Sequence, residues 1–251
     1  PLWNIDRWEG QNAVAPGTHS PEKFAYTESV LTYEGDELTN IELGYKASFI
    51  EGRLQLTASL YQQDIEDLPV YVADFSLDPV GGVYIANAGD GSSEGGEATL
   101  TYAISENISI TAFGSINETS VDGGFSGFDG SALVASGNSF IHAPEETYGF
   151  SLDASHNLYG NLRGRFYADY AHIGDRYADA ANTFLLEDYS IVNMRYSIIS
   201  DTGWSVALFV NNATDEVYVT DESDVSFGFG RIGRNYGRPR EMGVTLNWDF
   251  L

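Results

Sequence analysis

The stretch Met242-Gly243-Val244-Thr245-Leu246-Asn247-Trp248-Asp249-Phe250 alternates strictly between two kinds of side chain. Its even-numbered positions are all apolar, and its odd-numbered positions are all small or polar. Successive side chains of a β-strand point to opposite faces, so a period of two predicts a strand. One face of this strand is expected to meet an apolar environment and the other to meet water.

The same alternation recurs along most of the chain. Together with 242–250, the expected strands cover residues 41–49, 53–63, 96–104, 107–117, 146–155, 161–173, 189–198 and 203–212. Most of them approach the roughly 9–11 residues that a tilted strand needs to cross a bilayer. The sequence therefore predicts an all-β protein of about nine long strands, and no stretch shows a helical period.

The connections between these strands alternate in length. Short turns are expected at 50–52, 105–106, 156–160 and 199–202, and long polar loops at 65–94, 118–144, 174–187 and 213–237. Outer-membrane barrels have short periplasmic turns and long external loops. The pattern predicts an antiparallel transmembrane β-barrel whose C-terminus is periplasmic. A soluble β-sandwich is the alternative, although its strands are usually about 5–6 residues long.

Composition narrows the function classes. The 251 residues include 12 Lys and Arg against 37 Asp and Glu, a net charge of −25, which argues against binding nucleic acid. There is no cysteine, and the four histidines show no metal-ligand spacing. No nucleophile elbow appears. We therefore expect no catalytic residue, metal or cofactor.

The number of expected strands, about nine, indicates whether this chain can form a complete barrel. A barrel must close to remove its edges, and bacterial single-chain barrels have even strand numbers. Residues 1–36 are expected to form an extracellular loop region, and residues 37–251 the C-terminal barrel strands. We expect the chain to be the C-terminal part of a larger barrel.

Several short segments occur in an order that resembles TonB-dependent outer-membrane receptors. They are Thr39–Lys46 followed by Gly52-Arg53-Leu54, Asn87-Ala88-Gly89 with Gly96-Glu97, Ala143-Pro144 before Tyr148, Asn211–Glu216 with Tyr218, and Gly237-Arg238-Pro239-Arg240 leading to Phe250. The resemblance covers about residues 26–251.

The resemblance implies a barrel of about 22 strands around an N-terminal plug in the bacterial outer membrane. Such a receptor takes up a scarce solute, for example a siderophore or a carbohydrate, and is driven by the TonB complex. We expect this chain to include neither the plug nor the TonB box that the resemblance implies. The resemblance also implies that the barrel-assembly machinery recognises the closing strand. In the family this strand usually ends on an aromatic residue, whereas here Leu251 follows Phe250. A porin-like barrel without a plug and a soluble carbohydrate-binding sandwich remain alternatives.

Charged residues of the polar face are expected to point into the lumen if the apolar face meets lipid. The cations are Lys46, Arg53, Arg163, Arg165 and Arg195, all within a few residues of a periplasmic turn. They are expected either to pair with Asp153 and Asp169 or to dock the plug. Glu42 and Glu97 resemble the barrel glutamates that meet plug arginines in the family.

Two further groups of residues are candidate contact sites. By parity Arg238 and Arg240 face outward, where they would bind lipid phosphates or else form loop salt bridges. The long loops hold the residues expected to bind the solute, namely Tyr71, Asp74, Phe75, Tyr84, Phe125, Phe128, Phe184, Phe227, Phe229 and Tyr236. Aromatic rings beside acids can grip a neutral or cationic solute, and the loop acidity disfavours a strongly anionic one. Alternatively, the aromatic rings only pack the loops down.

Overall fold

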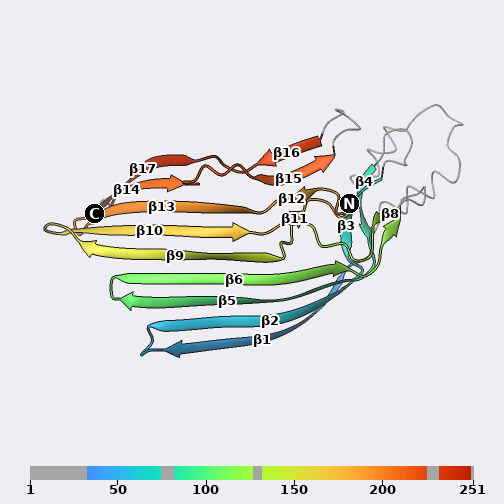
Figure 1. Cartoon of the computed structure of the whole chain (residues 1–251), viewed down its shortest axis with the longest axis horizontal. Coiled ribbons are helices and arrows are strands. Elements are labelled where there is room, and N and C mark those ends of the chain that lie inside the picture. Colours follow the sequence, from blue (N-terminus) through green and yellow to red (C-terminus); the bar gives the residue numbers. More distant parts are fainter. Residues whose placement is uncertain (1–32, 75–81, 127–131, 225–231, 250–251) are drawn as a thin grey trace, which may run out of the picture.

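The computed structural model describes residues 33–74, 82–126, 132–224 and 232–249 (Figure 1). All regular structure in this part of the chain is β-strand. Among these residues, no helix is long and apolar enough to cross a membrane. Most of the predicted loop region 1–36 lies outside the described residues.

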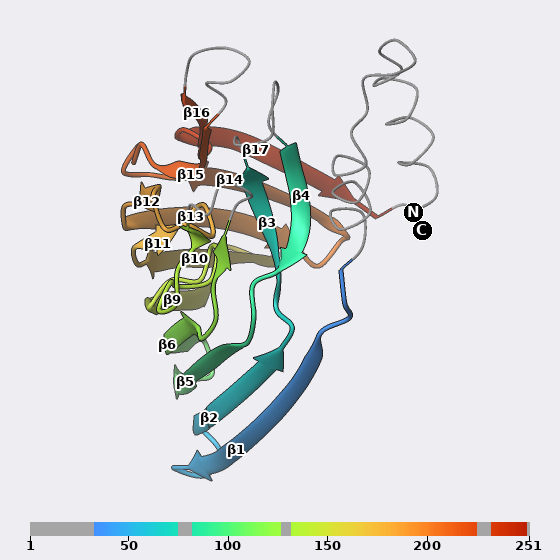
Figure 2. The same cartoon turned by 90° about the vertical axis from the view of Figure 1, so that its right-hand side faces the viewer.

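One antiparallel sheet dominates the molecule and confirms the predicted fold class. Its nine strands, in spatial order, are β1 (Glu37–Phe49), β2 (Leu54–Glu66), β5 (Gly91–Ser105), β6 (Ile108–Val121), β9 (Glu146–Asn157), β10 (Leu162–Ile173), β13 (Tyr189–Ser200), β14 (Trp204–Asn211) and β17 (Glu241–Trp248). Figure 2 shows the sheet bending into an arc from β1 to β17. Because no second sheet packs face to face on it in the described residues, the sandwich alternative is wrong.

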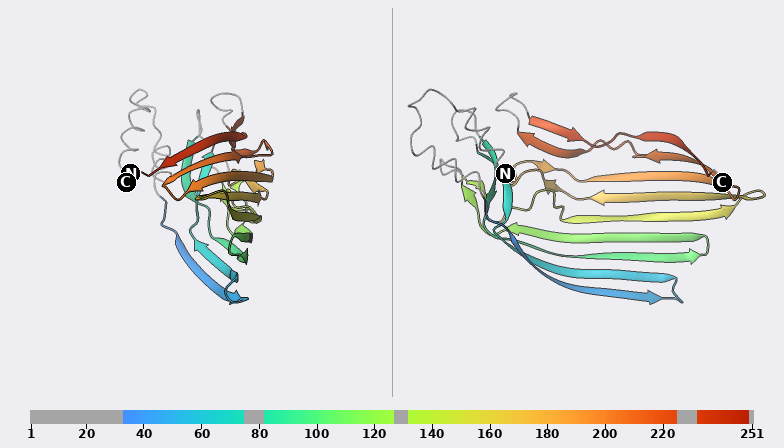
Figure 3. Two further views of the ribbon diagram at one scale, coloured as in Figure 1. Left: turned by 90° about the vertical axis from the view of Figure 1, so that its left-hand side faces the viewer. Right: turned by 180° about the vertical axis from the view of Figure 1, so that it is seen from behind.

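The long loops carry short hairpins that the alternation did not predict. They are β3 (Pro69–Asp74) with β4 (Gly82–Asn87), β7 (Phe125–Ser126) with β8 (Ala132–Val134), β11 (Arg176–Tyr177) with β12 (Leu185–Leu186), and β15 (Val219–Asp224) with β16 (Ile232–Tyr236). All four lie at one end of the nine-stranded sheet, and the short turns gather at the other end near the C-terminus (Figures 1 and 3). The two ends are called here the loop end and the turn end.

The two faces of the sheet differ as the sequence alternation predicts. Leu43, Ile116 and Leu246 lie on the apolar face and are 73%, 66% and 74% exposed. A contiguous apolar face of this kind is unusual on a protein surrounded by water and marks a surface that contacts another apolar phase. The register keeps the same kind of residue on one face from strand to strand, as in the pairing of Leu43 with Leu60. The sheet therefore presents an apolar belt to its surroundings.

Aromatic rings on the polar face pack over glycines of the neighbouring strand. Phe113 is in register with Gly149, and Phe209 with Gly243. A Cβ atom on either glycine would lie only 2.7 Å from the facing phenylalanine ring. The missing side chain thus makes room for the ring, which links the two strands without widening the sheet.

Among the described residues, the buried apolar cluster lies at the loop end rather than under the sheet. It consists of Val70, Ala86, Ala88, Val121, Val134 and Ala180, with Leu68, Phe125, Leu133, Phe140 and Ile141 packed against it. We call these residues the loop core. It joins three long connections, so the loops form a packed layer with a core of their own.

Candidate functional site: the polar face and the loop end

The polar face of β2, β5 and β6 carries a hydrogen-bonded layer. The hydroxyl of Ser59 donates to Glu97 Oε1 at 3.3 Å. The hydroxyls of Tyr61 and Ser93 both donate to Asn117 Oδ1, at 3.0 and 2.8 Å. The predicted luminal residue Glu97 thus lies on this face, with one oxygen hydrogen-bonded to Ser59 on the neighbouring strand. Glu42 lies on the same face of β1, in register with Tyr61.

One predicted luminal cation is paired within the wall. Arg165 Nε donates to both carboxylate oxygens of Asp153, at 3.0 and 2.9 Å, and Nη2 also contacts this carboxylate. Asp169, the other predicted partner, instead accepts a hydrogen bond of 2.8 Å from Asn193 Nδ2. Arg165 therefore forms the ion pair with Asp153 that is one of the two predicted alternatives for these cations.

Three other predicted luminal cations form no such pair. Within the described residues, Lys46, Arg163 and Arg195 have no carboxylate within the 4.0 Å of a salt bridge. Arg195 Nε donates to Ser197 Oγ, at 3.4 Å. Arg195 also borders a shallow niche of about 330 Å³ in the polar face, lined by Tyr167, Asp169, Asn193, Met194, Arg195, Phe209 and Asn211.

Arg53 differs from the prediction. Its guanidinium lies 5.8 Å from the centroid of the Tyr102 ring, and Nη1 donates to the carbonyl of Ile104 at 3.5 Å. Tyr102 follows the parity of the apolar face, because it pairs with Leu54. Arg53 stands in the turn before β2, where its long side chain can bend around the edge of the sheet. Arg53 is therefore a residue of the turn end rather than one of the cations of the polar face.

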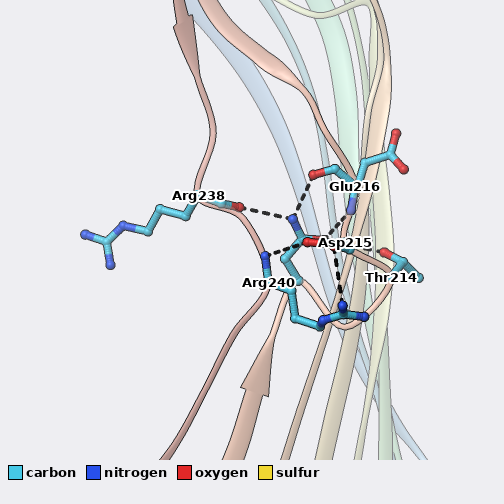
Figure 4. Close-up of polar contacts among 6 residues, drawn as sticks. Thr214, Asp215, Glu216, Arg238 and Arg240 are labelled. Carbon is cyan, nitrogen blue, oxygen red and sulfur yellow. Dashed lines mark hydrogen bonds and ion pairs between the residues drawn. The ribbon is translucent and has the colours of Figure 1, made fainter.

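Arg240 and Arg238 lie in one corner just before β17 (Figure 4). Arg240 donates to Asp215 from its backbone amide at 3.0 Å and from Nη2 at 3.4 Å. Arg240 thus forms a salt bridge within the loop, which is the predicted alternative to lipid contact. The side chain of Arg238 points away from this corner, while its carbonyl accepts a hydrogen bond from Asn212.

The structure describes only some of the predicted solute-binding residues. Phe75, Phe128, Phe227 and Phe229 lie outside the described residues. Tyr71, Asp74 and Tyr84 belong to the β3–β4 hairpin. Phe125 packs against the loop core, and Phe184 is half-buried, with its amide bonded to Asp179 Oδ1 at 2.9 Å. Tyr236 on β16 is 61% exposed. Phe125 therefore packs the loops together, which is the alternative prediction for the aromatic loop residues.

The loop end also contains a buried arginine that sequence reasoning missed. Arg176 on β11 is 8% exposed, and its Cζ lies 5.3 Å from the centroid of the Tyr189 ring. Tyr189 in turn stacks on Tyr218 with ring centroids 4.2 Å apart. Nothing in the local sequence Gly174-Asp175-Arg176-Tyr177 indicates burial, because the contacts of this side chain come from Tyr189 on β13 and from Val219 in another connection.

A second arginine of the loop end is fully paired. Arg234 on β16 donates from Nε to Glu222 Oε2 at 2.9 Å and from Nη2 to Glu222 Oε1 at 3.3 Å. The hydrogen bonds to Glu222, and secondarily its charge, raise the pKa of Arg234 above the ordinary value. This two-point contact is the usual way in which arginine meets a carboxylate.

A single curved antiparallel sheet with an apolar outer belt, short turns at one end and packed loops at the other defines the wall of an outer-membrane β-barrel. The family model described as "TonB dependent receptor-like, beta-barrel" matches residues 36–248. The chain belongs to this family of TonB-dependent receptors.

Solved structures support the same fold. The chain is similar to the ferric yersiniabactin uptake receptor FyuA from Yersinia pestis, with 18% identity and a TM-score of 0.67 over 86% of this chain and 30% of that one. It is also similar to the siderophore receptor PiuA from Acinetobacter baumannii, with 19% identity and a TM-score of 0.64 over 84% and 28% of the two chains. The copper transporter OprC gives 15% identity and a TM-score of 0.63 over 86% and 32%. The chain thus spans about a third or less of these proteins.

Proposed function

We propose that this chain is the C-terminal wall of an active transporter that imports a scarce solute across the bacterial outer membrane. The loop end is then extracellular, the turn end periplasmic, and the polar face luminal. The observation that carries the proposal is the contrast between the two faces. The apolar belt suits lipid, while Glu42, Lys46, Arg163 and Arg195 leave charges on the polar face that the described wall does not neutralise.

A plug inside the barrel is the partner that fits these charges. Cations and anions occur together on the polar face, so a folded domain with both kinds of charge can pair with them. The niche of about 330 Å³ beside Arg195 offers a recess for one of its side chains. We propose that the plug docks here, that the TonB complex moves the plug, and that the barrel-assembly machinery recognises the C-terminal strand.

The solute is a small molecule, and we propose a siderophore, a carbohydrate or a similar scarce compound. Of the similar structures, PiuA is a siderophore receptor, FyuA a ferric yersiniabactin uptake receptor and OprC a copper transporter. The chemistry proposed for this chain does not include a covalent step. Its mechanism is binding at the extracellular loops followed by gated passage.

The outer rim of the wall is proposed to contact lipid through Arg238. Its side chain leaves the corner formed by Asp215 and Glu216 (Figure 4), and no carboxylate of the described residues lies within 4.0 Å of it. A guanidinium at this height can bind a lipid phosphate with two hydrogen bonds. Arg240 is already engaged by Asp215 and would contribute less.

The test of the transporter proposal uses the full-length protein in planar bilayers. Charge reversal by Glu97→Lys removes the acceptor of Ser59 and places a cation where the plug is expected to present one. We expect a several-fold rise in ligand-free conductance, because repulsion loosens the plug. The matched control is Glu106→Lys, which reverses an exposed charge in the turn between β5 and β6.

Two outcomes would contradict the proposal. Unchanged conductance in Glu97→Lys would mean that this glutamate does not hold a plug. Solute uptake that persists in cells without TonB would instead indicate the porin-like alternative.

A further inference from the structure

The inference concerns the buried guanidinium of Arg176 at the loop end. Within the described residues its Nη1 is buried and has no hydrogen-bond acceptor. Its Nη2 reaches one acceptor, the carbonyl of Val219, at 3.5 Å, which is the longest distance at which such a contact still counts. The face of Tyr189 is the other contact of the charge. The group is thus enclosed by protein but is poorly satisfied by it.

Arg176 differs from the other described arginines because it is buried: those without a carboxylate partner, namely Arg53, Arg163, Arg195 and Arg238, are exposed or partly exposed to water. Arg165, Arg234 and Arg240 each meet a carboxylate, although all three are far more exposed than Arg176. Acids also outnumber bases by 37 to 12, so a carboxylate partner would be easy to supply. A buried charge without a counter-charge is much more costly than an exposed one, and a π face compensates only part of that cost.

The surroundings hold Arg176 in a fixed place on the luminal side. Tyr189 is in register with Ile173, which has the same parity as the polar-face residue Thr147. Tyr218 stacks on Tyr189 and itself packs over Gly237, where a Cβ atom would lie 1.9 Å from the ring. The connections 174–187 and 213–237 therefore meet around the guanidinium at the start of β13, and no residue larger than glycine fits at Gly237 behind the stack.

We propose that Arg176 is an anion-recognition residue of the extracellular mouth. It pairs with one oxyanion group, a carboxylate or a phosphate, of the solute that enters the barrel. The guanidinium fork binds such a group with two parallel hydrogen bonds, one of which takes up Nη1. The long hydrogen bond from Nη2 to the carbonyl of Val219 breaks when the oxyanion group binds. Because acids surround the mouth, a single oxyanion group fits better than a strongly anionic solute.

This inference rests on the proposed transport function, and its test is independent of transport. The thermal unfolding midpoint of the purified full-length protein is measured in detergent with rising citrate or inorganic phosphate at constant ionic strength. A ligand that binds the folded state raises the midpoint progressively with concentration. We expect such a rise with at least one of the two probes.

Three variants locate the effect. Arg176→Met should abolish the rise, and without a probe its midpoint should not fall below that of the wild type, since the variant removes an uncompensated buried charge. Arg176→Lys keeps the charge but loses the fork, so about tenfold more probe should be needed for the same rise. Arg234→Met is the control and should respond like the wild type, because this exposed arginine is already paired with Glu222.

The outcomes separate the two proposals. A wild-type protein that responds to neither probe, or an Arg176→Met variant that responds fully, overturns the anion site. If Arg176→Met does not fold, the shift of the response in Arg176→Lys decides instead. TonB-independent uptake alongside an intact probe response would overturn the transporter and leave the anion site standing.

Discussion

At the scale of single residues, Asn212 shows why a short polar motif after β14 matters. It is 4% exposed and has a left-handed backbone, with φ of 48°. Its Nδ2 donates to the carbonyls of Glu216 and Arg238, at 2.8 and 3.0 Å, and its Oδ1 accepts from the amide of Glu216 at 2.8 Å. Asparagine tolerates this backbone conformation better than most residues do. One side chain therefore closes the corner before the last hairpin and ties it to the approach to β17.

The first prediction is that Asn212→Ala destabilises the full-length protein by about 2–4 kcal/mol, because three hydrogen bonds between this buried side chain and backbone groups of Glu216 and Arg238 are lost. Urea unfolding in micelles, followed by tryptophan fluorescence, measures the change. The control is Asn157→Ala at the exposed end of β9, where the side chain forms no hydrogen bond in the described part of the chain. Equal changes in the two variants would show that the corner is not held by Asn212.

The contacts of individual side chains were predicted less completely from the sequence than the strands were. Parity placed Glu97 and Arg165 on the polar face, because a strand period of two needs no knowledge of distant segments. The contact of Arg240 with Asp215 joins residues 25 apart in a loop, and Arg176 contacts Val219, which lies 43 residues further along the chain. Neither arrangement has a local sequence signal. Arg53 shows the limit of parity itself, since a long side chain at a strand end can bend to the other face.

At the scale of elements, the nine predicted strands all form, but several extend further towards the loop end than the alternation indicates. β5 begins at Gly91, whereas its alternation is clear only from residue 96. The stretch Gly91-Ser92-Ser93-Glu94-Gly95 has no apolar member, so it carries no periodic signal. It is held as strand by pairing with both β2 and β6. Tertiary pairing thus sets these ends, and the hairpins in the loops are too short to predict from periodicity.

The second prediction concerns the loop core as a unit separate from the sheet. Val134 on β8 is 2% exposed within that core, so Val134→Asp buries an unpaired carboxylate there. We expect proteinase K to cleave residues 118–144 several-fold faster in the variant, because the loop layer opens locally. Heat-modifiable migration of the full-length barrel on gels should not change, since the strand ladders do not depend on this core.

Val217→Asp is the matched control for that experiment. Val217 also lies in a long connection but is 78% exposed, so a carboxylate there remains in water. Its cleavage pattern should equal that of the wild type. Loss of heat-modifiable migration in Val134→Asp would contradict the separation of the loop core from the sheet.

At the scale of the whole molecule, the nine-stranded sheet is open within the described residues. Its order runs from β1 to β17, and the outer edges of these two strands pair with nothing there. An open edge leaves backbone amides and carbonyls unsatisfied, and the hydrocarbon region of a membrane cannot solvate them. The apolar belt needs lipid, while the two edges need further strands. These requirements are met together only in a closed barrel.

The last prediction is that the 251-residue chain, produced alone, does not form a protease-resistant, heat-modifiable barrel in liposomes, whereas the full-length protein does. Refolding both proteins side by side and comparing boiled with unboiled samples on gels tests this. A discrete heat-modifiable species of about twice 27.4 kDa would contradict it. That result would mean that two copies of the sheet close edge to edge, because two sets of nine strands make an even-numbered barrel. Aggregates with neither property are the outcome that two unpaired edges lead us to expect.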